Sequence, residues 1–263
     1  MFKVQRQGYL LQRIQENASI SVNELAAALN TSMMTIRRDL NEMQENNILK
    51  RVHGGAVISS EDAQPSFLHR AVEERERKEA IAVEAAKRIK KGDIVVFDSS
   101  TTTLEVVKAI PAALEFTAIT TGLQTAIVLC GKPKAEVINI GGIVHSSSYT
   151  AHGHFAVDML KKFAASTAFI STKAVDIREG TFEAMPFLIE IKQAIAKAAK
   201  NVILVADSTK LNTTSLTKAV GWNMINELIT NDDKVFEINE ISRFVKVTAV
   251  PVRIMKSIEL KAL

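Results

Sequence analysis

The sequence has a single cysteine, no long apolar run and no strong excess of charge of either sign. Cys130 therefore cannot form an internal disulfide, and its apolar neighbours favour a buried thiol. No hydrophobic run approaches the ~20 residues that cross a bilayer, and the N-terminus has no signal-peptide core. We therefore expect a cytoplasmic protein with no membrane contact. The net charge of +4 over 263 residues does not by itself indicate nucleic-acid binding.

Common catalytic and metal-binding motifs are missing as well. The sequence contains no Gly-x-x-x-x-Gly-Lys phosphate loop and no nucleophile elbow. His152 and His154 lie two residues apart, but no cysteine or acidic cluster accompanies them, so we expect no metal site and no cofactor. Hydrophobic residues make up 47% of the chain, which allows a substantial core and excludes wholesale disorder.

Residues 21–43 predict two short helices joined by a polar turn, after a first helix in residues 5–15. Ser21 followed three residues later by Glu24 is a capping box, which marks the start of a helix. Ser32 can cap the next helix, because its hydroxyl can accept a hydrogen bond from an otherwise unpaired backbone N–H. That helix has an apolar stripe at helical spacing, made of Ile36, Leu40 and Met43.

The opposite face of this helix carries groups suited to phosphates and to base edges in a major groove. With 100° per residue, Met34, Arg38 and Asn41 point away from the stripe, and Thr35 and Arg37 flank them. An ordinary amphipathic surface helix is the alternative for this stretch alone. Asp39 is expected to pair with a nearby arginine rather than to contact a base.

Residues 48–58 predict a short hairpin, with strands at 48–52 and 56–58 and a turn at 53–55. A hairpin that follows a helix-turn-helix is a wing. The candidate DNA-binding residues of the whole module are Ser21, Ser32, Met33, Met34, Thr35, Arg37, Arg38, Asn41, Lys50, Arg51 and His53.

Three motifs in this module resemble the N-terminal signature of DeoR-family transcriptional regulators. They are Glu-Leu-Ala at 24–26, Thr-Ile-Arg-Arg-Asp-Leu at 35–40 and Arg-Val-His-Gly-Gly-Ala at 51–56. The spacing between them also fits. Met33 and Met34 occupy variable positions of such helices, so they do not identify the operator sequence.

From residue 92 onward, apolar runs typical of doubly buried strands alternate with helical stretches, notably 188–199. The runs are 94–97, 118–120, 137–140, 168–170, 202–205 and 228–230, followed by a helix-strand region that includes 245–252. The sequence therefore predicts an α/β protein: a small winged helix-turn-helix (1–58), a linker (59–77) and a larger, doubly wound, mostly parallel α/β effector domain (78–263).

Ligands of such sheets bind beyond the C-terminal ends of the strands. Four strand ends carry hydroxyls, glycines or a lysine that could hold an anion. The candidate effector-binding residues are Asp98, Ser99, Ser100, Thr101, Thr102, Thr103, Thr120, Thr121, Gly141, Gly142, Asp207 and Lys210. Taken singly, each segment can also be a helix cap, a plain turn or a surface lysine.

Together these segments resemble the DeoR-family effector domain, which is similar in fold to ribose-5-phosphate isomerase. Asp98, Thr101 and Thr102 match the family pattern, whereas Ser100 stands where glycine is usual. Thr120-Thr121 replaces the common Thr-Asn, and Ser-Thr-Lys-Ala at 171–174 replaces a glycine-rich segment. These departures leave the identity of the effector open.

The resemblance implies a DNA-binding regulator, most often a repressor in this family, of sugar metabolism. Its partners would be double-stranded operator DNA, a phosphorylated sugar or related metabolite, and further copies of itself in a dimer or tetramer. The alternative is a sugar-phosphate isomerase with a DNA-binding appendage, for which Asp98, Asp176, Glu179 and Asp207 are the candidate carboxylates. A DNA-binding protein that senses no metabolite is a third possibility.

Overall fold

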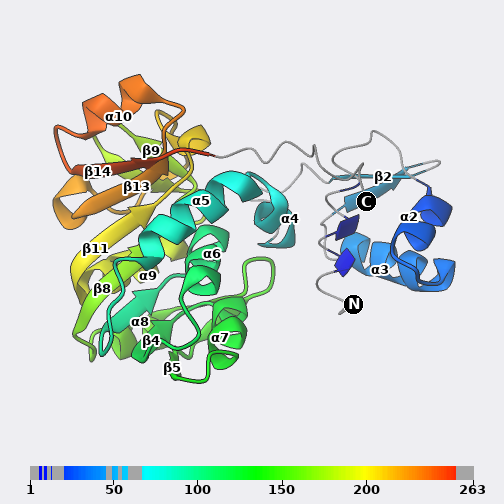
Figure 1. The fold of residues 1–263 in the computed structure, drawn as a ribbon, viewed down its shortest axis with the longest axis horizontal. Helices are drawn as coiled ribbons and strands as arrows, with labels where there is room; N and C mark the ends of the chain where they lie inside the picture. Colours follow the sequence, from blue (N-terminus) through cyan, green and yellow to red (C-terminus); the bar gives the residue numbers. More distant parts are fainter. Residues whose placement is uncertain are drawn as a thin grey trace, which may run out of the picture. The chain divides into compact units, whose positions relative to one another are not determined.

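The computed structural model describes residues 6–7, 9–10, 13, 21–45, 49–52, 55–58 and 67–252, with the backbone alone at 45, 49–52 and 55–58. The chain divides into two compact units (Figure 1). The first extends to Glu73 and includes Ser146–Ser148, and the second comprises the remainder from Glu74 onward. No helix among the described residues is long and apolar enough to cross a membrane.

The first unit contains the predicted pair of helices and the hairpin. Its elements are α2 (Val22–Ala28), α3 (Met33–Glu45), β1 (Leu49–Val52), β2 (Gly55–Ile58) and α4 (Phe67–Val72). The five described residues of the predicted first helix are helical, and two of them, Gln7 and Leu10, are buried. Leu10 packs in a small core with Leu25 of α2 and with the predicted stripe of α3. Strands β1 and β2 are antiparallel, with Leu49 opposite Ile58 and Val52 opposite Gly55.

The second unit is built on a seven-stranded parallel sheet of order β14-β13-β11-β8-β3-β4-β5. Its strands are β3 (Ile94–Phe97), β4 (Phe116–Thr120), β5 (Ala135–Asn139), β8 (Ala165–Ile170), β11 (Ala199–Val205), β13 (Glu227–Asn231) and β14 (Lys246–Val250). Its helices are α5 (Arg75–Ala86), α6 (Thr101–Ala109), α7 (Leu123–Cys130), α8 (His154–Leu160), α9 (Phe187–Lys197) and α10 (Val235–Ile241). The predicted α/β fold class is confirmed.

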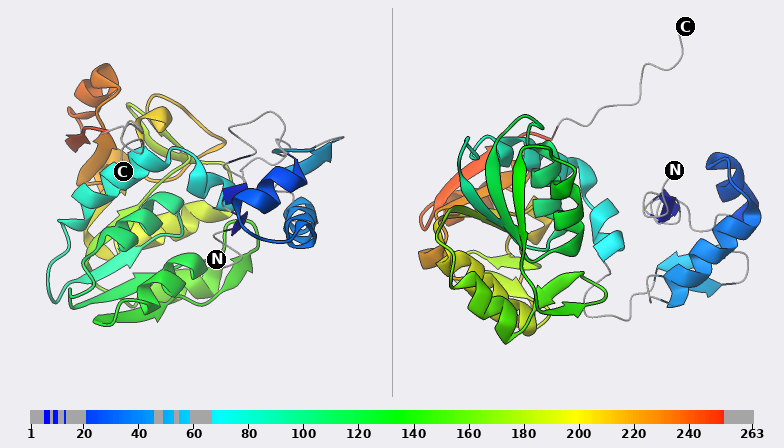
Figure 2. Two further views of the ribbon diagram at one scale, coloured as in Figure 1. Left: turned by 45° about the vertical axis from the view of Figure 1, so that its right-hand side comes forward. Right: turned by 90° about the horizontal axis from the view of Figure 1, so that it is seen from below.

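Helices cover both faces of this sheet (Figures 1 and 2). Val95 and Phe97 of β3 pack with α5, α6 and α7, whereas Val96 points to the core shared with α8, α9 and α10. Burial on both faces explains why β3 reads as a continuous apolar run, since alternate side chains of a strand point to opposite faces.

Two small antiparallel elements were absent from the sequence prediction. The first is a three-stranded sheet of β9 (Ala174–Asp176), β10 (Gly180–Glu183) and β12 (Thr217–Lys218). The second is the hairpin of β6 (Ile143–His145) and β7 (Thr150–His152). These strands have only two to four residues, which is too short for a clear alternation of apolar and polar side chains.

The prediction that Cys130 is buried was wrong, because its side chain is exposed. Cys130 is the last residue of α7, which buries Thr125 and Leu129 and leaves Ile127 exposed. A step of 100° beyond Leu129 turns Cys130 out of the core. The apolar run was therefore typical of a helix with one buried face, not of a fully buried segment.

Candidate functional site

Helix α3 begins where the sequence predicted, at a cap formed by Ser32. The Ser32 hydroxyl accepts a hydrogen bond from Thr35 N at 3.1 Å and lies 2.9 Å from the Thr35 hydroxyl. The capping box of α2 is also present, since Ser21 Oγ accepts from Glu24 N and Glu24 accepts from Ser21 N at 2.8 Å. Ser21 and Ser32 therefore fix the two helix starts.

The two faces of α3 differ as the spacing predicted. Ile36, Leu40 and Met43 are almost completely buried. The outer face exposes two methionines, two arginines and an amide, namely Met33, Met34, Arg37, Arg38 and Asn41. Asp39 is fully buried and pairs with Arg6, whose Nη2 donates to Asp39 Oδ1 at 3.2 Å. Asp39 thus joins α3 to the N-terminal helical segment that contains Arg6. Arg37 and Arg38 remain exposed on the surface.

The wing residues are described only in part. Lys50 and Arg51 lie on β1, opposite Val57 and Ala56 of β2. His53 lies outside the described residues. The predicted base and phosphate contacts of the module therefore remain predictions.

In the second unit, the direction in which successive strands are added to the sheet reverses between the central strands β3 and β8. From β3 the chain builds outward through β4 to β5, and from β8 it builds the other way through β11, β13 and β14. Doubly wound sheets bind ligands at such a switch point. Asp98 follows β3 and Ser171 follows β8, and Ser171 N donates to Asp98 Oδ2 at 2.8 Å across this point.

The carboxylate of Asp98 is saturated with hydrogen bonds. Its Oδ1 accepts from Ser100 N at 2.9 Å and from the Thr103 hydroxyl at 2.7 Å. Its Oδ2 accepts from Ser171 N and from Lys192 Nζ, at 2.8 and 3.1 Å. Asp98 is 2% exposed, so these four bonds replace the water that burial removes. It holds together the loops that follow β3 and β8.

Lys192 of α9 completes a buried cluster of three charges. Besides Asp98, its ammonium pairs with Glu183 Oε1 at 2.8 Å and donates to the Ser171 carbonyl. Burial alone raises the pKa of Asp98, but Lys192 and the hydrogen bonds lower it, and the net pKa is below the ordinary value. Burial lowers the pKa of Lys192, but the opposing effect of Glu183 and Asp98 is larger, so the net pKa lies above its ordinary value. Both directions favour an ionised Asp98–Lys192 pair at neutral pH.

The hydroxyl-rich segment after β3 forms the start of α6. Ser100, which replaces the family's usual glycine, is the cap: its Oγ accepts from Thr103 N at 3.1 Å. Thr101, Thr102 and Thr103 are buried in the first turn. With serine instead of glycine at position 100, the backbone there is less free, but the side chain caps α6.

A second group of polar side chains converges beside Asp98. The Ser171 hydroxyl lies 3.4 Å from both Thr102 Oγ1 and Lys210 Nζ. Lys210 follows β11 and lies 3.7 Å from Asp207 Oδ2. Three neighbouring strands, β3, β8 and β11, thus contribute a hydroxyl, a hydroxyl and an ammonium to one place.

Strand β4 contributes mainly to the support of this edge. Thr120 Oγ1 accepts from Gly122 N at 3.1 Å, and Thr121 is buried. A Cβ on Gly122 would lie 2.9 Å from the Cα of Ser99, so this approach requires glycine. The Ser99 hydroxyl bonds Thr150 of β7 at 2.6 Å.

The glycine pair after β5 has a packing role. A Cβ on Gly142 would lie 2.5 Å from the His152 carbonyl, and its φ of +153° also favours glycine. Gly141 is exposed and has open space around it. Gly142 thus allows the chain entering β6 to pass close to the backbone of β7. It does not serve the group formed by Ser171 and Lys210.

Four residues of this edge were missed in the sequence: Thr150, Ser171, Glu183 and Lys192. Lys192 lies next to Ile191 on the apolar side of α9 but reads as an ordinary helix lysine. Glu183 is the last residue of β10, a strand that the sequence did not predict, so it did not stand out as a strand-end residue. Only Ser171 carried a usable signal, since it directly follows the apolar run of β8.

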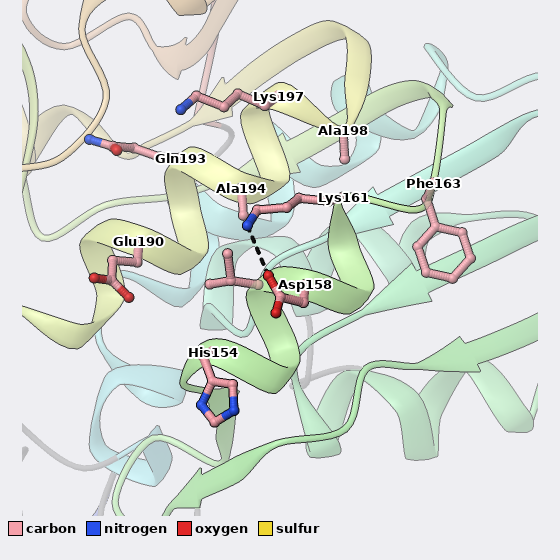
Figure 3. Close-up of a pocket in the computed structure, with 10 residues that line it drawn as sticks. His154, Asp158, Lys161, Phe163, Glu190, Gln193, Ala194, Lys197 and Ala198 are labelled. Carbon is pink, nitrogen blue, oxygen red and sulfur yellow. Dashed lines mark hydrogen bonds and ion pairs between the residues drawn. The ribbon is translucent and has the colours of Figure 1, made fainter.

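A separate groove of about 540 Å³ lies between α8 and α9 (Figure 3). Its rim is charged and includes Asp158, Lys161, Glu190 and Lys197, with Lys161 paired to Asp158 at 2.8 Å. None of the predicted effector-binding residues lines it.

Comparison with known proteins gives matches over both units. Residues 6–62 match the DeoR-like helix-turn-helix domain, and residues 73–232 match the DeoR C terminal sensor domain. The regulator GolR of Listeria innocua is 35% identical over 236 residues, covering 89% of this chain and 92% of that protein. The glycerol-3-phosphate regulon repressor of Escherichia coli is 26% identical over 231 residues, covering 88% of this chain and 92% of that protein.

Two solved structures share only low similarity with this chain. Ribose 5-phosphate isomerase A of Neisseria gonorrhoeae has a TM-score of 0.38 and 11% identity, over 51% of this chain and 52% of that one. The beta subunit of eIF2B from Chaetomium thermophilum has a TM-score of 0.45 and 14% identity, over 93% and 71%. The family matches, by contrast, span both units and confirm the resemblance seen in the motifs: the chain belongs to the DeoR family of transcriptional regulators.

Proposed function

We propose that the chain is a cytoplasmic repressor of sugar-metabolism genes whose hold on operator DNA is controlled by a phosphorylated sugar. Residues 1–58 would form the DNA-binding domain, residues 59–77 the linker and residues 78–263 the effector-binding domain. The exposed face of α3, with Arg37, Arg38 and Asn41, would read the major groove. Because one winged domain makes few base contacts, a homo-oligomer would bind repeated half-sites.

The observation that carries the effector proposal is the convergence of Thr102, Ser171 and Lys210 at the switch point of the sheet. Two hydroxyls and an ammonium suit a phosphate group, since hydrogen bonds to a charged ligand are stronger than neutral ones. The name of one relative, the glycerol-3-phosphate regulon repressor, fits this chemistry.

The carboxylate of Asp98 supports binding rather than turnover. A general base needs a free lone pair within reach of the proton that it removes. Both oxygens of Asp98 already accept two hydrogen bonds each. Asp176 accepts from two backbone N–H groups of its own turn, and Glu179 is paired with Lys218. Asp207 is bonded by Thr209.

The proposal is tested by thermal denaturation of the full chain with a panel of sugar phosphates, followed by operator titration with each compound that binds. A ligand at about 100 times its Kd should add ~2.7 kcal/mol to the unfolding free energy. The same compound should raise the protein concentration needed to bind the operator. Stabilisation without any change in operator binding would contradict control by the metabolite.

A further inference from the structure

We propose that Arg77 and Asp233 form a relay between the effector edge and the turn at Glu74, where the chain passes from the first unit to the second. The inference rests on the proposed effector site and adds how that site would communicate. It follows from a continuous set of ion pairs and hydrogen bonds within the second unit.

The receiving end of the relay is the turn between α4 and α5. Helix α4 ends at Val72, and α5 begins at Arg75. Glu74 lies between them with φ 50° and ψ 34°, a left-handed conformation that non-glycine residues adopt at a cost. Its side chain does not cap α5. The division between the two units falls immediately before it. Such a turn needs outside contacts to stay in one conformation.

Arg77 supplies those contacts. Its guanidinium pairs with the carboxylate of Glu74, one turn earlier. The same guanidinium donates from Nε to Asp233 Oδ2 at 2.9 Å, and its Nη2 lies 2.9 Å from the same oxygen. Asp233 follows β13, so Arg77 ties the turn to the C-terminal edge of the parallel sheet.

From Asp233 the contacts continue to the loop that carries Lys210. The Ser208 hydroxyl donates to Asp233 Oδ2 at 3.4 Å and accepts from Asn231 Nδ2 at 2.8 Å. Asn231 Oδ1 in turn accepts from Ser208 N at 2.8 Å. Ser208 lies between Asp207 and Lys210, within the short 3-10 helix Ser208–Lys210.

An anion that binds Lys210 changes the balance of these contacts. It competes with Asp207 for the ammonium, which lies only 3.7 Å from the carboxylate. The loop at Asp207 then rearranges, and the adjoining Ser208 shifts its bond to Asp233. The Arg77 guanidinium divides between Asp233 and Glu74, so a change at Asp233 alters how firmly the Glu74 turn is held.

The test is hydrogen exchange on the full chain with Asp233→Asn, and with Glu240→Gln as the matched control. Glu240 also pairs with an arginine, Arg243, at 2.9 Å near the end of α10, and this ion pair does not involve the turn at Glu74. The amides to follow are those of Glu73 and Lys78, which donate to the carbonyls of His69 and Glu74. Without ligand, Asp233→Asn should speed their exchange at least about threefold, and Glu240→Gln should leave it unchanged. Arg77→Gln should have at least the effect of Asp233→Asn.

The ligand arm uses glycerol-3-phosphate and inorganic phosphate as probes. A probe that stabilises the wild type should change exchange at Glu73 and Lys78, whereas Asp233→Asn should bind it with the same affinity and show no such change. Equal exchange in wild type and both Asp233→Asn and Arg77→Gln, without ligand, overturns the relay. If neither probe binds, that counts against the proposed effector chemistry, and the ligand-free comparison still decides the relay.

Discussion

The ammonium nitrogen of Lys192 lies 3.1 Å from Oδ2 of Asp98, and both side chains are almost completely buried. Because the two residues are 94 positions apart, this pair joins α9 to the loop after β3. The pair adjoins the proposed phosphate site through Ser171, whose N–H donates to Asp98 and whose hydroxyl lies near Lys210. Its role is to hold the strand ends in place.

Replacing Lys192 by Met should therefore strongly destabilise the second unit. The change leaves Asp98 and Glu183 buried without their cation, and breaking a buried ion pair in this way costs about 3–5 kcal/mol. Urea unfolding measures the loss. Lys161→Met is the control, because its pair with Asp158 is exposed and should contribute at most ~1 kcal/mol. Equal losses in the two variants would show that the buried cluster is not structural.

A different carboxylate, Glu227, should make the stability of the sheet sensitive to acid. Burial raises the pKa of Glu227, but Arg88, Thr248 and Lys246 lower it from 4.5 to about 2. A depressed pKa gives stability that is complete above the ordinary value and is lost as pH falls through the folded-state value. The wild type should therefore lose up to roughly 2 kcal/mol between about pH 6 and pH 3 through this residue alone.

The measurement is the unfolding free energy of wild type and Glu227→Gln over that range. The advantage of the wild type should shrink as the pH falls, because only Glu227 can be protonated at this position. A constant difference between the two proteins would show that Glu227 titrates near its ordinary pKa when folded.

Arg38→Ala should weaken operator binding. Arg38 is exposed opposite the buried stripe of α3, and loss of a bidentate base contact costs about 1–3 kcal/mol. A mobility-shift titration checks it, with the exposed Arg243→Ala as the control. If Arg38 contacts a phosphate instead, specific and non-specific binding should fall together. Unchanged binding would remove α3 as the recognition helix.

Thr102→Val and Lys210→Ala should each impair the response to the metabolite while leaving operator binding intact. Loss of a hydrogen bond to a charged ligand costs ~1.5–3 kcal/mol, or roughly 10- to 150-fold in affinity. Operator titrations with and without the compound found by thermal denaturation measure the response. Lys218→Ala, which removes an exposed lysine paired to Glu179, should respond like wild type. A normal response in both test variants would place the phosphate elsewhere.

Limited proteolysis should cut first between residues 59 and 65 and leave a folded C-terminal fragment. The sequence there is rich in Ser, Asp and Pro and has no helical or strand periodicity. Mass spectrometry of the early fragments identifies the site. A first cut within residues 94–206 would contradict the domain boundaries.

Much of the framework was predictable because its signals are local. The Ser21 capping box, the stripe of α3 and the apolar run of β3 are each contained in a few consecutive residues, and each formed where it was expected. Local periodicity reports which face of an element is buried. It carries no information about what that face meets.

The charged cluster was not predictable for that reason. Lys192 reaches Asp98 from a helix, and Glu183 reaches Lys192 from a short antiparallel strand that the sequence did not reveal. A buried lysine on an amphipathic helix looks like a solvated one until its partners are known. The strand-end rule located the correct edge of the sheet, but the support beneath that edge comes from residues far along the chain.

The position of β3 in the sheet constrains how the protein is made. Its partner on one side, β4, follows within about twenty residues, but its partner on the other side pairs Val95 with Thr167, far downstream. While the ribosome synthesises the intervening chain, one edge of β3 lacks its neighbour. Unpaired apolar edges recruit other strands. Emergence of β8 covers this edge of β3, and the unpaired edge of the growing sheet then passes to β8 until β11 pairs with it.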